Sequence, residues 1–150
     1  RPVQSRASAR MLPIGISAMA ALLVLNAAVA RTAAAEEWHI TRVYDGDTFY
    51  VEVPDLPDEI GKIGVRIRGI DTPEIGGKAK CGWERRRGSE ARARLVELLR
   101  SPIEYRDLKW DKYGGRVDAT VIADGADVGK VLIEEGLARP YSGGKRRGWC

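Results

Sequence analysis

Carboxylates concentrate in two turn-like segments of the chain. One is Asp45-Gly46-Asp47-Thr48, and the other is Asp71-Thr72-Pro73-Glu74. Carboxylate and carbonyl oxygens at turns are the ligands that a hard cation such as Ca²⁺ takes. Arg66 and Arg68 precede the second segment. A metal ion with arginine beside it can bind a phosphodiester and stabilise the negative charge that builds up during attack on phosphorus.

Neither segment is decisive alone, because similar runs occur in many hairpin turns and at many strand ends. The combination is stronger, since the two turns bracket a pair of predicted strands and can meet at one end of a barrel. Other chemistries fit less well. His39 is the only histidine, so a Ser/His/Asp triad would need that residue, and nothing near it suggests a nucleophile. Two cysteines with one histidine do not make a plausible zinc site.

Hydrophobic periodicity and turn signals predict the elements that must position these residues. Five strands are predicted, at residues 38–44, 48–53, 65–70, 103–108 and 116–123. Helices are predicted at residues 84–100 and 128–135, and Gly88 weakens the first half of the longer one. Five strands with a helix after the third fit a β+α fold, a five-stranded Greek-key barrel of the OB type with two or three helices.

Four ordered motifs resemble the signature of staphylococcal nuclease-like (thermonuclease) proteins. They lie at residues 43–48, 65–74, 111–116 and 135–138. The resemblance extends over about residues 40–141, and four motifs in the right order are more specific than any one of them. It implies a five-stranded OB barrel with helices and Ca²⁺-dependent cleavage of phosphodiester bonds in DNA and RNA.

The resemblance also assigns a calcium site and a place for the attacking water. Asp47 and Asp71 match the two calcium-binding carboxylates, and Thr72 matches a ligand that acts through its main-chain carbonyl. Asp45 matches a nearby acidic residue that supports these ligands. Glu74 falls where the family has an acidic residue beside the attacking water, usually described as the general base.

A second set of matched residues is expected to bind the nucleotide. Arg66 and Arg116 take the positions of the two phosphate-binding arginines. Lys112 and Tyr113 match residues that contact the terminal phosphate, and Tyr141 lies near the position of a tyrosine that packs against the nucleotide. The segment before Arg116 has one glycine more than the simplest family pattern, and a local bulge is expected to absorb it.

The net charge of the chain comes from its N-terminal part. The chain has 25 basic and 21 acidic residues, and residues 1–35 hold four of the arginines and no acidic residue. The other 21 basic residues therefore balance the 21 acidic ones. Binding to nucleic acid must depend on local arrangement rather than on net charge, and it should be sensitive to salt.

Residues 1–35 are predicted to be a signal peptide. Arginines precede an apolar run at residues 12–30, and small residues follow it, so cleavage is expected after Ala35. The protein is then exported to the periplasm or secreted, with a nuclease-like domain at residues 36–141 and a basic tail at residues 142–150. The alternative is an uncleaved membrane anchor, because the apolar run is long enough to span a bilayer.

Export affects the expected state of the two cysteines. An oxidising compartment favours a disulfide between Cys81 and Cys150, which would tie the tail to the loop after the central motif, and two free thiols are the alternative.

Arg68 is expected to face solvent beside a carboxylate. The tryptophans at loops and strand ends could stack on bases, but packing is their more common role.

The expected function is a calcium-dependent nuclease that acts on DNA, RNA or both. A monomer without an obligate protein partner is expected, and it meets the membrane only through the signal peptide. Two alternatives stay open. One is an OB-fold nucleic-acid-binding module with weak catalysis, and the other is a membrane-anchored envelope protein that keeps its leader.

Overall fold

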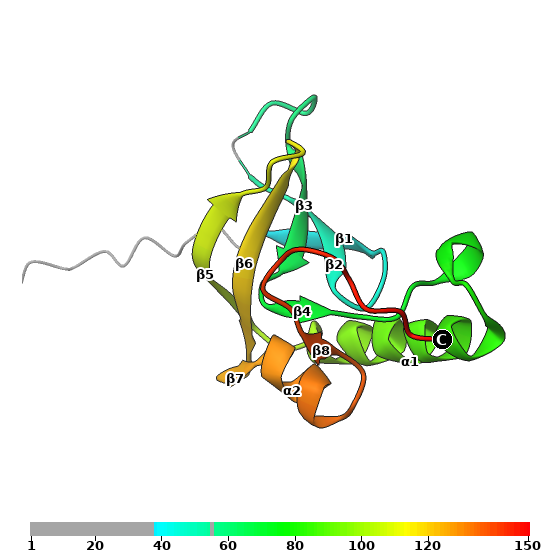
Figure 1. Ribbon diagram of the computed structural model, residues 1–150. Helices are drawn as coiled ribbons and strands as arrows, with labels where there is room; N and C mark the ends of the chain where they lie inside the picture. Colours follow the sequence, from blue (N-terminus) through cyan, green and yellow to red (C-terminus); the bar gives the residue numbers. More distant parts are fainter. Residues whose placement is uncertain (1–37, 55) are drawn as a thin grey trace, which may run out of the picture. The chain divides into compact units, whose positions relative to one another are not determined.

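The computed structural model describes residues 38–54 and 56–150 (Figure 1). The predicted signal peptide and its cleavage point lie outside the described residues. Within residues 38–54 and 56–150, no helix is both long enough and apolar enough to cross a membrane.

Eight strands and two α-helices make up the described chain. The strands are β1 (His39–Val43), β2 (Thr48–Glu52), β3 (Lys62–Ile67), β4 (Ile70–Asp71), β5 (Ile103–Trp110), β6 (Arg116–Ala123), β7 (Ala126–Asp127) and β8 (Arg139–Pro140). The helices are α1 (Gly82–Leu98) and α2 (Val128–Glu134), and a short 3₁₀ helix spans Gly76–Lys78.

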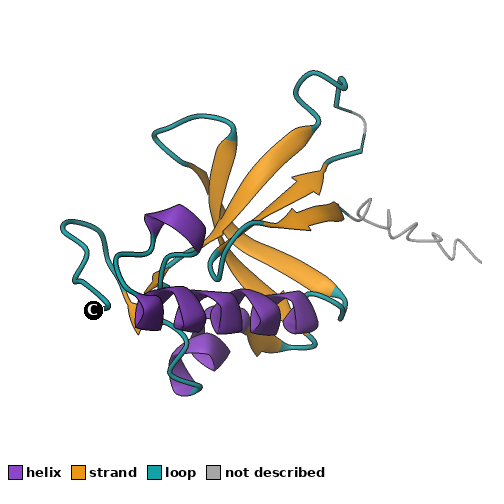
Figure 2. Cartoon of the chain, turned by 90° about the vertical axis from the view of Figure 1, so that its right-hand side faces the viewer, coloured by secondary structure: helices purple, strands orange, loops and turns teal. Residues whose placement is uncertain are grey.

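The main sheet has the strand order β1-β2-β3-β6-β5, with β7 paired to β6. β3 and β6 are parallel, and the other neighbours are antiparallel. The sheet curls into a half-barrel, and α1 runs beside it (Figure 2). The aromatic rings of Trp38, which precedes β1, and Tyr105 on β5 lie 4.7 Å apart and so connect the two edge strands. The predicted β+α fold of the OB type is confirmed.

Alternation along the strands builds the core. On β6, Val117, Ala119 and Val121 are buried, whereas the residues between them are partly exposed. This period of two is what a sheet with one covered face requires. Helix α1 covers that face with Ala91 and Leu95, which are fully buried.

The prediction for the third strand was wrong at its end. A single strand was expected at residues 65–70, but β3 stops at Ile67 and Gly69 adopts a φ of +81°. This left-handed conformation, which suits glycine, turns the chain out of the main sheet. Ile70 and Asp71 then form β4, which pairs with β8 near the C-terminus. As a result, Asp71 lies beside the tail of the chain.

Candidate functional site

The β1–β2 turn brings Asp47 into the interior. The main-chain N–H of Asp47 donates to Oδ1 of Asp45 at 3.1 Å, which fixes the turn. Gly46 is needed because a Cβ atom at this position would lie 2.7 Å from the Cβ of Ala91 on α1 and 3.0 Å from the Cβ of Thr72. The turn is therefore pressed against both the helix and the second acidic segment.

The second acidic segment is held against α1 in a similar way. A Cβ at Gly88 would lie 2.5 Å from the main-chain oxygen of Glu74 and 2.7 Å from that of Pro73. The buried carboxylate of Glu84 accepts hydrogen bonds from the main-chain N–H groups of Lys80, at 2.6 Å, and Glu74, at 3.4 Å. Helix α1 thus positions the acidic segment directly.

The predicted long helix is present, although Gly88 was expected to weaken its first half. α1 runs without interruption from Gly82 to Leu98. Glycine in a helix costs about 1 kcal/mol relative to alanine. At this position the cost accompanies close packing, because only glycine lets α1 approach the main chain of Glu74.

Replacing Gly88 by alanine is therefore expected to destabilise the protein. The gain in helix propensity of about 1 kcal/mol opposes an overpacking cost of typically about 1–3 kcal/mol, here against main-chain atoms that cannot rotate away. The Gly88→Ala variant should unfold at a lower temperature and lose activity as Glu74 shifts, as measured by thermal denaturation and cleavage rate. Gly82→Ala is the matched control, because a Cβ there meets only a flexible arginine side chain at 3.6 Å. Equal destabilisation in both variants would contradict this account.

Asp47 is the centre of a buried hydrogen-bond network. Its Oδ1 accepts from Arg66 Nη1 at 2.7 Å and from Thr48 Oγ1 at 2.9 Å. Its Oδ2 accepts from the main-chain N–H and the hydroxyl of Thr72, both at 3.3 Å. Arg66 also donates to the main-chain oxygen of Ile70 at 3.1 Å. The first acidic turn, the arginine of β3 and the start of the second acidic segment are thereby joined.

Asp71 has one satisfied and one unsatisfied carboxylate oxygen. Oδ2 accepts from the indole Nε1 of Trp149 at 3.1 Å. Oδ1 is buried and has no hydrogen-bond partner among the described residues, although Arg146 Nε lies 3.2 Å away as an ion-pair partner. A buried carboxylate oxygen without a hydrogen bond is costly, and a bound cation is one way to satisfy it.

A second carboxyl group, that of Asp45, lies partly buried beside Asp47. Burial, followed by the charge of Asp47, raises the pKa of Asp45 to about 7. The side chains of Asp47 and Glu74 line the same hollow as Asp45. The atoms that these three side chains could offer to a metal ion are all carboxylate oxygens. They therefore fit a hard cation such as Ca²⁺ rather than a soft one. In the described part of the chain, no three or more Asp, Glu, His or Cys side chains are grouped so that they could hold a metal ion. The calcium site that the family resemblance implies has only two carboxylates and one main-chain carbonyl, so it does not require such a group.

The two expected arginines face this hollow together. Arg66 and Arg116 both line it with Asp47 and Glu74. Arg116 lies opposite Gly64 in the parallel β3–β6 register, and a Cβ at Gly64 would approach the side chain of Arg116 to 3.3 Å. The small residue on β3 therefore makes room for the arginine of β6.

The extra glycine before Arg116 lies in the β5–β6 turn and not in a bulge. Gly114 and Gly115 both have positive φ angles, and the main-chain N–H of Asp111 donates to the oxygen of Arg116 at 2.9 Å, which closes the turn. The irregularity of the β5–β6 pairing occurs instead between Arg106 and Lys109. The turn also holds Arg116 through an ion pair with the Asp111 carboxylate, where Nε donates at 2.7 Å.

The predicted nucleotide-binding residues lie in an adjoining hollow. Lys112, Tyr113 and Tyr141 line it together with Arg66 and Arg116. Lys112 Nζ lies 4.9 Å from the centre of the Tyr113 ring. Tyr113 is largely exposed, so its ring is available to a ligand.

A comparison with protein-family models matched residues 64–147 to the staphylococcal nuclease homologue family. The chain belongs to the staphylococcal nuclease family. No curated protein sequence matched the chain in a separate comparison. Family membership indicates a nuclease-like function related to nucleic acid.

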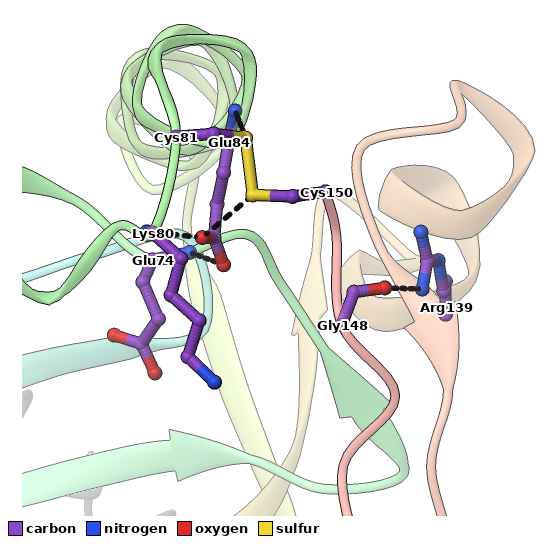
Figure 3. The surroundings of a disulfide bond; sticks show 7 residues. All are labelled: Glu74, Lys80, Cys81, Glu84, Arg139, Gly148 and Cys150. Atoms are coloured by element: carbon purple, nitrogen blue, oxygen red, sulfur yellow. Dashed lines mark hydrogen bonds between the residues drawn. A yellow bond between two sulfur atoms is a disulfide. The ribbon is translucent and has the colours of Figure 1, made fainter.

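In this staphylococcal nuclease homologue, the predicted disulfide between Cys81 and Cys150 is confirmed, and it ties the C-terminal tail to the loop after the acidic segment. The tail passes β4 and ends beside the start of α1 (Figure 1). Cys150 forms a disulfide with Cys81, the residue that caps α1, with a Cα–Cα distance of 6.2 Å. Figure 3 shows the Glu84 carboxylate next to this disulfide, between the helix and the loop that carries Glu74.

Arg146 and Trp149 are site residues that the sequence did not identify. Arg146 lies in the tail that the sequence marks only as basic, and Trp149 is one of the tryptophans for which packing was the more common role. The signal in the sequence that could have identified them was Cys150. A disulfide between Cys150 and Cys81 must bring Arg146 and Trp149 close to the loop after Glu74. Arg68 is exposed as predicted, but its Nη2 donates to the main-chain oxygen of Asp107 at 2.6 Å and not to a carboxylate.

Proposed function

We propose that this protein is a calcium-dependent nuclease that hydrolyses phosphodiester bonds of DNA, RNA or both. The observation that supports this most strongly is the single hollow in which Asp47 and Glu74 meet Arg66 and Arg116. Carboxylates alone would suit a cation, and arginines alone would suit a phosphate. Their combination in one hollow is suited to a phosphate that is bound and attacked in the same place.

The calcium ion would be held by the carboxylates of Asp47 and Asp71 and by the main-chain carbonyl of Thr72. When bound, it supplies positive charge that offsets the negative charge on the phosphate oxygens. The Oδ1 atom of Asp71, which is buried, makes no hydrogen bond and attracts the guanidinium of Arg146, is the feature of this chain that best supports the assignment.

Arg66 and Arg116 would bind the scissile phosphate. The guanidinium of Arg66 is fixed before substrate binds, since Nη1 donates to Asp47 and Nη2 to Ile70. Arg116 is held in a similar way by Asp111. Donors that are already oriented stabilise the more negative transition state without a cost of reorganisation at the moment of reaction.

Glu74 would orient the attacking water and accept its proton. Its side chain is partly exposed at the hollow, while its main-chain N–H is anchored by Glu84. A carboxylate in this position needs to be within hydrogen-bond reach of the water that attacks phosphorus in line. Lys112, Tyr113 and Tyr141 would hold the neighbouring nucleotide in the adjoining hollow.

Supercoiled plasmid and single-stranded RNA, each incubated with the protein and Ca²⁺, test this function. Conversion of the plasmid to nicked and linear forms, or shortening of the RNA, is the expected result. A shift of either nucleic acid in a native gel without any broken strand would identify a binding module instead. Raising the salt concentration should weaken cleavage, because the contacts to phosphate are electrostatic.

We also propose that the protein is exported. The support is the arginine-rich and then apolar sequence at residues 1–35. Sequencing the N-terminus of the exported protein should find Glu36 first. A retained leader in the membrane fraction would support the anchored alternative.

A further inference from the structure

The C-terminal tail reaches the same acidic residues that the proposed function assigns to calcium and water. Arg146 Nε lies 3.2 Å from Asp71 Oδ1, and its Nη1 donates to Glu74 Oε1 at 2.9 Å. Trp149 Nε1 donates to the other oxygen of Asp71. Both oxygens of Asp71 therefore face the tail.

Trp149 is held firmly enough to orient its partner. It is 9% exposed, its ring lies 6.3 Å from that of Trp83 on α1, and the guanidinium of Arg139 lies 3.5 Å from its ring centre. Arg139 also donates to the main-chain oxygen of Gly148 at 3.0 Å (Figure 3). The next residue, Cys150, is covalently joined to the cap of α1. A residue fixed on this many sides can set the direction of the carboxylate that it binds.

Arg146 differs from Trp149 in both exposure and charge. Its side chain is 43% exposed, and it bridges two carboxylates that would otherwise repel each other. A guanidinium in this position supplies the positive charge that the carboxylates need when no metal ion is bound. A calcium ion approaching Asp71 Oδ1 must therefore compete with Arg146.

We propose that the C-terminal tail is part of the calcium site, with two opposing contacts that the Cys81–Cys150 disulfide holds in place. Trp149 is a positioning residue that holds Oδ2 of Asp71, so that Oδ1 would be the oxygen left for the ion. Arg146 is a competing cation that occupies Asp71 and Glu74 until calcium displaces it. The inference rests on the proposed function, since it assumes that Asp71 is a calcium ligand.

Calcium affinity, measured by isothermal titration calorimetry on the full chain, tests the two contacts separately. Trp149→Phe keeps an aromatic ring but removes the indole N–H, and it should weaken calcium binding about tenfold, as loss of a hydrogen bond to a metal ligand typically does. Arg146→Gln removes the competing charge and should strengthen binding about threefold to tenfold, with a smaller effect at high salt.

The opposite signs distinguish this proposal from a purely structural role. A tail that only stabilises the fold would weaken binding in both variants or in neither. Arg100→Gln is the matched control, because Arg100 is exposed, lies just beyond the end of α1 that is far from Cys81, and its side chain has no hydrogen bond or ion pair within residues 38–54 and 56–150. Its calcium affinity should equal that of the unmodified protein.

The disulfide is tested by repeating both substitutions in a Cys81→Ser, Cys150→Ser background. If the bridge holds the two contacts in place, the effects of Trp149→Phe and Arg146→Gln on calcium affinity should shrink towards none, since coupled groups lose their individual effects together. Undiminished effects in this background would show that the disulfide has no part in the site.

The outcomes separate this inference from the proposed function. An unmodified protein that binds calcium and cleaves nucleic acid, with variants of unchanged affinity, would overturn the inference alone. An unmodified protein that binds no calcium would overturn both. Circular dichroism of each variant identifies any change that comes from unfolding.

Discussion

Asp71→Asn is expected to reduce the rate of cleavage by at least about 10²-fold, the scale typical for loss of a key electrostatic group in an active site. Asparagine has nearly the same shape as aspartate, and its amide oxygen can still accept from Trp149 Nε1. The substitution therefore removes charge from the buried Oδ1 position without opening a cavity. The initial rate of plasmid nicking at a fixed calcium concentration measures the effect.

Stability should change little in this variant. The ion pair that it removes joins the buried Asp71 to Arg146, whose side chain is substantially exposed and keeps Glu74 as a second partner, so solvent and Glu74 offset much of the loss. Asp124→Asn is the control, because Asp124 lies in the turn after β6, at the other end of that strand from Arg116. If Asp71→Asn cut at close to the rate of the unmodified protein, Asp71 would not be a calcium ligand.

Arg66→Lys is the second substitution with a large expected effect. Lysine keeps a positive charge near the buried Asp47 carboxylate, so the substitution avoids the loss of about 3–5 kcal/mol that follows when one partner of a buried pair is removed. Lysine has no planar pair of N–H donors like the one with which Arg66 contacts Asp47 and Ile70. It therefore cannot bind a phosphate in the way proposed for Arg66. A decrease of about 10²–10³-fold in cleavage rate is expected.

Arg68→Lys is the matched control for this substitution. Arg68 lies two residues further along, is exposed, and donates to a main-chain carbonyl away from the hollow. Its variant should cut within a few-fold of the unmodified rate. Similar rates for Arg66→Lys and Arg68→Lys would remove Arg66 from the proposed mechanism, and thermal denaturation would show whether both remain folded.

The fold followed closely from the sequence because its strands alternate and its turns are marked. β6 was predicted with its observed bounds, and the hairpin around Asp45-Gly46 is present. The end of the third strand was predicted wrongly, since Val65 to Ile70 alternates without interruption. A positive φ at Gly69 ends it, and the sequence does not show which glycine will adopt that conformation.

The candidate site was predictable in part because its acidic residues occupy two short, compact motifs. Asp47 and Thr72 are joined by a hydrogen bond, so the two acidic motifs meet, as their positions around a pair of predicted strands indicated. The contributions of Glu84 and Gly88 were not predictable, since they depend on how closely α1 approaches Glu74. Trp149 reaches Asp71 through a contact between residues 78 positions apart, and no local pattern encodes such a contact.

The calcium dependence of cleavage tests the central proposal most directly. The initial rate of plasmid nicking should fall to background when a calcium chelator is in excess, and it should return when calcium is added beyond the chelator. The same cycle applied to Asp71→Asn should restore little activity. Full cleavage in excess chelator, at the rate seen with calcium, would contradict the proposal that Asp47, Asp71 and Thr72 form the calcium site of a nuclease.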